Sequence, residues 1–176
     1  MLVGAVGFTG VAIALGMILD GHVLVIAWSV QAVVAAWLGN QRKDAVPFVG
    51  SLGLLAAAAF HVLRFEAPIE ALQRGVPNLA NAMVALAVLA AACVGAGWFA
   101  PNAETLAAAK IDTGDASLRS LLVGVAAVVG LYLLSIVVVE AVGPGEQRAQ
   151  VALSIFWGLL GLGAVVVGLS RRLAPV

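Results

Sequence analysis

Long apolar runs, separated by short clusters of charged and turn-forming residues, make up most of this chain. A helix that crosses about 30 Å of hydrocarbon needs roughly 20 consecutive apolar residues. The runs lack the alternation of apolar and polar positions that a membrane β-strand requires. They therefore predict six transmembrane helices, at about residues 2–19, 23–39, 45–63, 78–100, 118–139 and 151–169.

The composition indicates that the lipid bilayer is the solvent of this chain. Of its 176 residues, 63% are hydrophobic and 10% are charged, and the mean hydropathy is +1.12. A soluble domain is about 45–50% apolar and about 25% charged, so the chain has too little polar surface to cover a water-facing globule. We therefore predict an all-α, polytopic integral membrane helix bundle, with residues 1–176 forming a single transmembrane domain.

Two connections between the predicted spans are long enough to hold structure of their own. Phe65–Pro77 has apolar residues at three- and four-residue spacing, which suits either a short interfacial helix or an ordinary solvated loop. Pro101–Ser117 carries several charged residues and a turn-forming Thr-Gly-Asp triplet. Its acidic residues lack the regular spacing of a calcium loop, which favours a plain connection.

Basic residues predict the orientation in the membrane, because cytoplasmic loops are enriched in Lys and Arg. Six spans place both termini on one side. That side collects Arg42, Lys43, Lys110, Arg119, Arg171 and Arg172, whereas the other side collects Arg64, Arg74 and Arg148. This excess favours cytoplasmic termini, with two basic pairs, Arg42–Lys43 and Arg171–Arg172, as topological anchors at the interface.

Few polar side chains interrupt the predicted spans, and no span has a central Asp, Glu, Lys or Arg. Polar groups inside a membrane are costly, so those present mark either a helix contact or a functional path. The candidates for such intramembrane contacts are Gln31, Asn81, Tyr132 and Ser135. We expect Gln31 to form an interhelical hydrogen bond, and Asn81 to share capping and packing roles with Asn78 at a helix start.

The sequence contains no motif for catalysis or for cofactor or metal binding. Cys93 is the single cysteine, and the two histidines lie far apart, so no metal-ligand spacing is present. Nucleophile-elbow and phosphate-binding glycine motifs are missing as well. The net charge is zero, without a basic patch that would favour nucleic acid. We expect no enzyme activity, no cofactor and no nucleic-acid partner.

Two of the predicted spans share a sequence pattern. Trp28 is followed eleven residues later by Gly39, and Trp157 is followed eleven residues later by Gly168. A basic pair comes after each glycine. Both spans would cross in the same direction, which makes this a parallel repeat, unlike the inverted repeats of many transporters. Segments rich in Ala, Val, Leu and Gly also produce such matches by chance. A true repeat predicts a further span after the second basic pair, in a polypeptide that extends past Val176.

The first unit, Trp28-Ser-Val-Gln31 with Trp37-Leu-Gly39 and Arg42–Lys43, resembles a Trp-Ala-Leu-Glu…Trp-Leu-Gly…Arg-Arg unit. Such units occur in a family of large, many-span bacterial membrane proteins of unknown function. Leu153–Arg172 resembles that family's later Leu-Ser-x-x-Trp…Gly-Leu-Arg-Arg unit. Gln31 stands where the family unit tends to have Glu. The resemblance implies a many-span protein of the bacterial inner membrane, of which this chain would be a fragment, and it supplies no activity.

These observations leave three hypotheses for the function. The first is a structural or assembly subunit that packs with other membrane helices or with itself. The second is a transporter or lipid-handling protein, with Gln31, Asn81 and Tyr132 along a path. A membrane enzyme is the third. Convergence of the four polar candidates on one cavity would favour transport, whereas scattered positions would favour packing.

Overall fold

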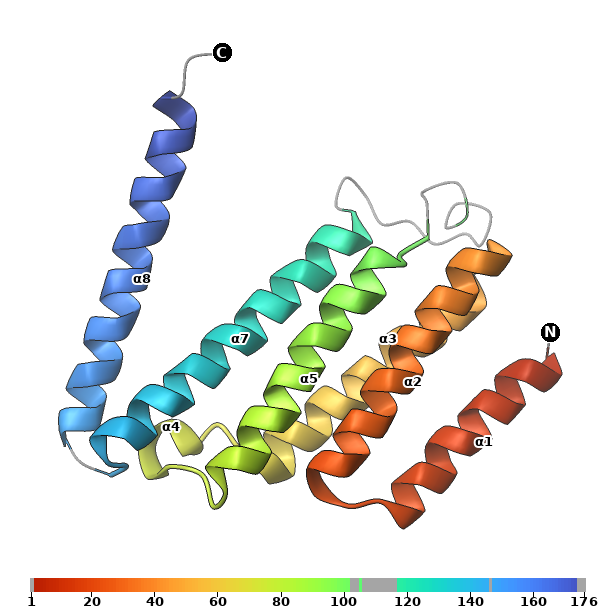
Figure 1. Cartoon of the computed structure of the whole chain (residues 1–176), viewed down its shortest axis with the longest axis horizontal. Helices are drawn as coiled ribbons and strands as arrows, with labels where there is room; N and C mark the ends of the chain where they lie inside the picture. Colours follow the sequence, from red (N-terminus) through yellow and green to blue (C-terminus); the bar gives the residue numbers. More distant parts are fainter. Residues whose placement is uncertain (1, 102–104, 106–116, 146, 174–176) are drawn as a thin grey trace.

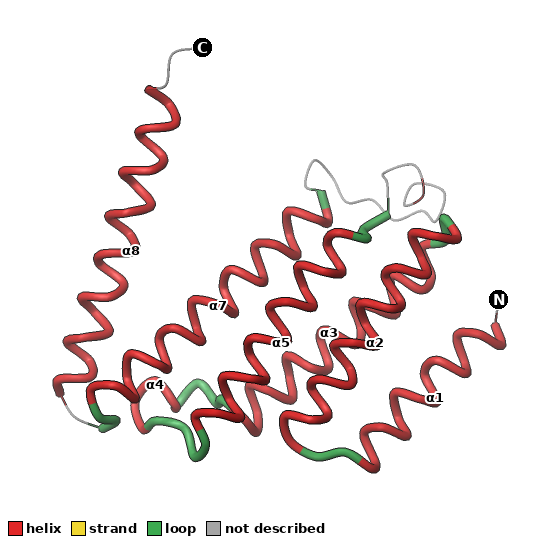
Figure 2. Tube along the Cα trace, in the orientation of Figure 1, coloured by secondary structure: helices red, strands yellow, loops and turns green. Residues whose placement is uncertain are grey.

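The computed structural model describes residues 2–101, 105, 117–145 and 147–173, and it describes only the backbone of residues 2–6 and 171–173. The described residues form an all-α bundle, as predicted, and no strand occurs among them (Figures 1 and 2). Its long helices run in alternating directions. They are α1 (Leu2–Ile18), α2 (Gly21–Arg42), α3 (Ala45–His61), α5 (Leu79–Trp98), α7 (Leu118–Val142) and α8 (Gln147–Leu173).

Five helical segments in the described part of the chain are long and apolar enough to cross a membrane. They are Gly21–Arg42, Ala45–Arg74, Leu79–Trp98, Leu118–Val142 and Gln147–Ser170. The first predicted span, residues 2–19, corresponds to α1, which ends at Ile18, and the part of α1 with described side chains, Gly7–Ile18, is apolar. The chain therefore has the helices of a multi-pass membrane protein.

Several helix ends differ from the predicted span ends. The fifth span was predicted at about residues 118–139, but α7 continues to Val142. The sixth helix begins at Gln147, four residues before the predicted span. A charged residue ends an apolar run without ending the backbone hydrogen bonding, so helices extend past the hydrocarbon into the polar interface. The expected connection Pro101–Ser117, with Lys110, lies mostly outside the described residues.

Three helices begin at a side chain that caps their first turn. The Asp44 carboxylate accepts a hydrogen bond from the Val46 N–H at 3.0 Å, and the Asn78 side chain accepts one from the Asn81 N–H at 3.1 Å. Ser117 caps α7 in the same way through the Ser120 N–H. Such caps satisfy N–H groups that the helix itself leaves unpaired. The cap at Asn78 is the role expected for it from the sequence.

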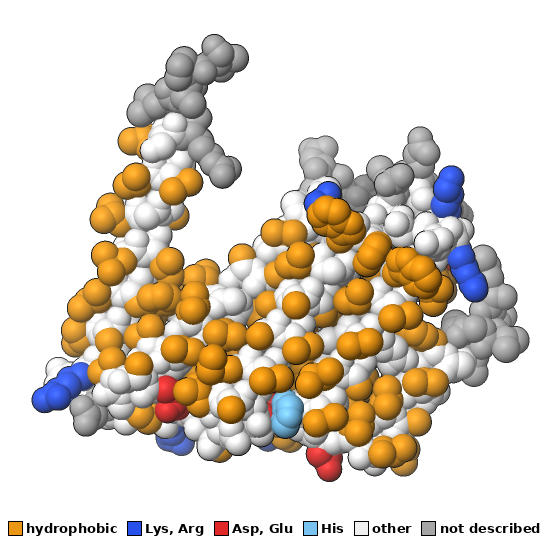
Figure 3. Space-filling view, viewed as in Figure 1, with side chains coloured by type: hydrophobic (Ala, Val, Ile, Leu, Met, Phe, Trp, Pro, Cys, Tyr) orange, Lys and Arg blue, Asp and Glu red, His pale blue; other side chains and the backbone are white. Residues whose placement is uncertain are grey.

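The core lies among α2, α3, α5 and α7, with α1 and α8 at the two edges of the bundle (Figure 1). Most of its buried side chains are alanines, and Phe48 and Ile136 are the largest that are fully buried. Small side chains allow close contact between helices where lipid offers no hydrophobic driving force. Figure 3 shows apolar side chains over the middle of the visible face and charged ones toward its two ends, as a bilayer requires.

Candidate functional site

Two side chains of α2 attach the edge helix α1 to the bundle. Trp28 Nε1 donates to the Ala12 carbonyl, and Gln31 Nε2 donates to the Phe8 carbonyl, each at 3.0 Å. The donors lie three residues apart and the acceptors four apart, so both pairs lie on facing helix surfaces. A Cβ at Gly16 would lie 3.2 Å from the Trp28 ring, so the glycine makes room for the indole. Gln31 thus makes the interhelical hydrogen bond expected from the sequence.

The second tryptophan of the repeat makes an equivalent bond at the opposite edge. Trp157 Nε1 on α8 donates to Ser135 Oγ on α7 at 3.1 Å. The Ser135 hydroxyl is buried and donates in turn to the Leu131 carbonyl at 2.8 Å. Each repeated tryptophan therefore bonds to the helix that precedes its own. A tryptophan near a span end is typical of an interfacial anchor, but in the structure the indole N–H groups of Trp28 and Trp157 bond to neighbouring helices.

The connection between α3 and α5 is fixed to the ends of α7 and α8. Tyr132 places its hydroxyl 2.9 Å from the Ala67 carbonyl and 2.8 Å from the Pro68 carbonyl. The Glu140 carboxylate accepts a hydrogen bond from the Val76 N–H at 2.7 Å. Gln150 Nε2 adds a bond to the Leu72 carbonyl at 3.2 Å. These bonds hold residues 67–76 against the lower ends of both helices, as oriented in Figure 1.

The shape of this connection differs from the simple interfacial helix that was one of the two expectations. The chain leaves α3 through a π-helical turn, Val62–Glu66, and then forms one short helix, α4 (Ala71–Arg74). Gly75 follows with a φ of +76°, and a Cβ there would lie 2.5 Å from Glu140 Oε1. Glycine is required because only it combines the positive φ with this close approach.

The four polar candidates do not hydrogen-bond to one another in the described part of the chain. Gln31 bonds to α1, and Asn81 contributes its backbone N–H to the cap of α5. Tyr132 and Ser135 lie three residues apart on α7 but bond to different neighbours. Each of these bonds is therefore made at a different place in the bundle.

Some buried polar atoms lack a hydrogen-bond partner among the described residues: Ser29 Oγ, Gln31 Oε1, Ser51 Oγ and His61 Nε2. The His61 ring packs edge-on against Trp28, with ring centroids 6.2 Å apart, and lies 4.9 Å from the Phe65 ring. No three His, Cys, Asp or Glu side chains of the described residues are grouped so as to hold a metal ion. The chemistry that these residues offer is hydrogen bonding between helices.

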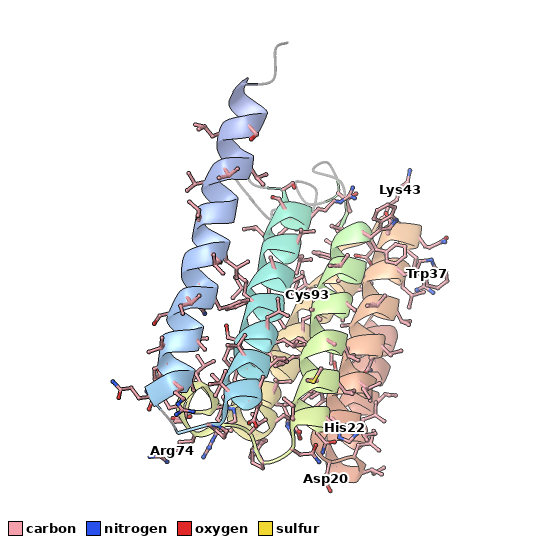
Figure 4. The ribbon with its side chains drawn as sticks, turned by 60° about the vertical axis from the view of Figure 1, so that its left-hand side comes forward. Asp20, His22, Trp37, Lys43, Arg74 and Cys93 are labelled. Carbon is pink, nitrogen blue, oxygen red and sulfur yellow. The ribbon has the colours of Figure 1, made fainter. Side chains whose placement is uncertain are left out.

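Charged and aromatic side chains mark the two ends of the helices. Lys43 and Trp37 lie at one end and Asp20, His22 and Arg74 at the other (Figure 4). At the end near Lys43, the Arg119 guanidinium lies 4.8 Å from the centre of the Trp98 ring, within the range of a cation–π contact. Arg42 and Lys43 are exposed there. The side chains of the other predicted anchors, Arg171 and Arg172, lie outside the described residues.

Comparison with known proteins identifies no relative of this chain. No protein-family model matches the chain, and neither the curated proteins nor the solved structures contain a match. The fold and the hydrogen-bonded links between its helices are therefore the basis for any functional conclusion.

Proposed function

We propose that this chain is a packing and assembly subunit of the bacterial inner membrane, which associates with other membrane helices or with further copies of itself. The observation that carries the proposal is the use of its intramembrane polar groups. Trp28, Gln31, Tyr132 and Trp157 each donate a hydrogen bond to a neighbouring helix or connection. A membrane protein that holds helices together uses polar groups in this way.

The outer helices supply the surfaces for assembly. Val11, Ile13 and Met17 of α1 are 54%, 60% and 84% exposed. On α8, a ridge formed by Ile155, Leu159, Leu162 and Val166 is more than half exposed along its length. Apolar ridges of this kind contact lipid or the helices of a neighbouring subunit.

The location and orientation are part of the same proposal. The bacterial inner membrane follows from the resemblance of the two tryptophan units to a many-span bacterial family. Cytoplasmic termini follow from the excess of basic residues on the side of Lys43. In right-side-out vesicles, a Lys43→Cys variant is expected to resist a membrane-impermeant maleimide, whereas a His22→Cys variant reacts. The reverse labelling pattern would contradict this orientation.

The assembly itself is tested by the mass of the purified particle. The intact protein would be extracted in a mild detergent and its mass measured by native mass spectrometry. The proposal predicts a complex heavier than one 17.8 kDa chain, with a defined stoichiometry. A lone chain without a partner would contradict it, and a lone chain with a bound solute or lipid would instead favour a transporter or lipid-handling protein.

A further inference from the structure

The described charged side chains divide unequally between the two ends of the bundle, which Figure 4 marks by Lys43 at one end and by Asp20 and Arg74 at the other. The Lys43 end has three basic residues and one acidic residue, which are Arg42, Lys43, Arg119 and Asp44. The opposite end has three basic and four acidic residues, which are Arg64, Arg74, Arg148, Asp20, Glu66, Glu70 and Glu140. Among the described side chains, the Lys43 end therefore has a positive balance and the opposite end a negative one.

At the Lys43 end, the packing of α5 against α7 places an arginine beside a tryptophan. Trp98 is the last residue of α5, and Arg119 is the second residue of α7. A Cβ at Gly97 would lie 3.3 Å from Leu122 Cβ and 3.5 Å from the Arg119 carbonyl oxygen, so the glycine lets the two helix ends meet. The Arg119 guanidinium consequently lies 4.8 Å from the centre of the Trp98 ring.

The hydrogen-bond donors of Arg119 remain available to a ligand. Its side chain is exposed, and it forms no hydrogen bond or ion pair with any residue that the structure describes. A cation–π contact uses the positive charge of a guanidinium without occupying its five N–H donors. Trp98 is itself 68% exposed. The pair therefore presents a positioned positive charge at the surface of the bundle.

Lipid headgroups are the surroundings of this pair. Both α5 and α7 are long and apolar enough to cross a membrane, so the ends of both helices reach the headgroup region. Tryptophan favours that region because its ring is apolar and its N–H is polar. A guanidinium at this level meets phosphate groups, whose oxygens match its planar fork of donors. Val94 and Val123, one helical turn deeper than Trp98 and Arg119, are each 46% exposed, so apolar surface continues toward the middle of the bilayer.

We propose that Arg119, placed over the Trp98 ring, binds the phosphate of an anionic phospholipid whose acyl chains lie along the apolar surface of α5 and α7. The positive balance of this end favours an anionic lipid over a zwitterionic one. The site goes beyond the assembly function proposed above, and it does not depend on which end of the bundle faces the cytoplasm.

A second arginine–aromatic pair, at the opposite end, provides a matched control. The Arg64 guanidinium lies 5.8 Å from the centre of the Phe65 ring, which is 63% exposed. Phenylalanine attracts a cation less strongly than tryptophan does. The negative balance of that end, which includes the neighbouring Glu66, disfavours an anionic lipid. We therefore expect Arg64 to contribute little to the binding of such a lipid.

Native mass spectrometry of the whole chain tests the site, because it resolves each bound lipid. The protein in mild detergent is titrated with phosphatidylglycerol and, separately, with phosphatidylcholine. Arg119→Gln is expected to weaken binding of the first phosphatidylglycerol by about fivefold, whereas Arg64→Gln leaves it unchanged. Trp98→Leu keeps the arginine and removes the ring, which should weaken binding by about twofold to fivefold. Equal losses in the two arginine variants, or unchanged binding in Arg119→Gln or Trp98→Leu, would overturn the proposal.

Two measurements on the unaltered protein remain decisive even if a variant fails to fold. Phosphatidylglycerol with a photoreactive headgroup should label peptides that contain Trp98 or Arg119, and labelling confined to residues 62–76 would overturn the site. Excess inorganic phosphate should leave the bound phosphatidylglycerol in place, because apolar contacts hold its acyl chains. Displacement by inorganic phosphate would show a site for a free anion and would contradict the assignment to a lipid.

Discussion

Two helix faces carry the same pattern but have different surroundings. One is the face of α2 formed by Trp28, Ala32, Ala35 and Gly39, which we call the α2 seam, and the other is the face of α8 formed by Trp157, Gly161, Ala164 and Gly168, the α8 seam. Both begin with a tryptophan whose indole bonds to the preceding helix, Trp28 to α1 and Trp157 to α7. The α2 seam continues beneath α3, with Gly39 against Phe48, whereas Gly168 on the α8 seam has no neighbour within 4 Å. The difference teaches that the pattern alone does not determine whether another helix packs on the face, because this depends on the rest of the fold.

The largest expected effect comes from a side chain added at the glycine of each seam. Gly39→Val forces a Cβ against the backbone of Asp44 and Phe48, which cannot move aside as a flexible side chain would. Overpacking of this kind costs about 1–3 kcal/mol. The matched control, Gly168→Val, meets open space and is expected to change stability by less than about 0.5 kcal/mol. Unfolding by sodium dodecyl sulfate in mixed micelles measures both, and equal losses would contradict the comparison.

Removal of the two donors of α2 is expected to release α1. The Trp28→Phe, Gln31→Leu double variant keeps most of the packing volume but loses both bonds to the α1 carbonyls. Interhelical hydrogen bonds in membranes are worth about 0.6–2 kcal/mol each. A cysteine placed at Ala12 should therefore react faster with a lipid-soluble maleimide. Val30→Leu, at an exposed position of the same helix, serves as the control. An unchanged rate would show that α1 is held by other contacts.

Tyr132→Phe should loosen the connection between α3 and α5 by about 1 kcal/mol, because one hydroxyl donor is lost. Hydrogen exchange of the backbone amides of residues 67–76 should speed up, with little change elsewhere. Ser154→Ala removes a hydroxyl that bonds only to the Gln150 carbonyl of its own helix and should leave that exchange unaltered. Equal exchange rates of residues 67–76 in the two variants would contradict the attachment of this connection by Tyr132.

The smallest effect is expected from Glu140→Gln, because the role of the Glu140 side chain is to accept a hydrogen bond. Glu140→Gln keeps an oxygen for the Val76 N–H and should change stability by less than about 0.5 kcal/mol. Glu140→Leu leaves that N–H without its acceptor and should cost about 1–3 kcal/mol. Thermal unfolding in detergent measures the stability of both variants. A large loss in the glutamine variant would mean that the negative charge itself is needed.

The long apolar runs were sufficient to predict the helices, because each span must satisfy its own backbone hydrogen bonds and bury no charge. The few polar residues in these runs also predicted the interhelical bond of Gln31 and the cap at Asn78. The runs did not predict helix ends such as Val142, since a charged residue limits the hydrocarbon run and not the helix. The bonds from Tyr132 to Ala67 and Pro68 join residues more than sixty positions apart. No local pattern encodes such a contact, which depends on the packing of α7 beside the connection.

The sequence also did not predict that each repeated tryptophan bonds to the preceding helix. An indole near a span end is typical of interfacial anchoring, and the same residue type serves both purposes. The acceptors of these two bonds are a backbone carbonyl, that of Ala12, and the hydroxyl of Ser135, and no sequence pattern marks either of them as a partner.

A double-mutant cycle across Trp157 and Ser135 tests this role most directly. The cycle compares Trp157→Phe, Ser135→Ala and the combined variant, with the free energy of unfolding measured in mixed micelles. If the indole bonds to the Ser135 hydroxyl, the two changes are coupled by about 0.6–2 kcal/mol, in the range of interhelical hydrogen bonds. Additive losses, within about 0.3–0.5 kcal/mol, would show that Trp157 anchors α8 at the interface and that the repeated tryptophan is not a link between helices.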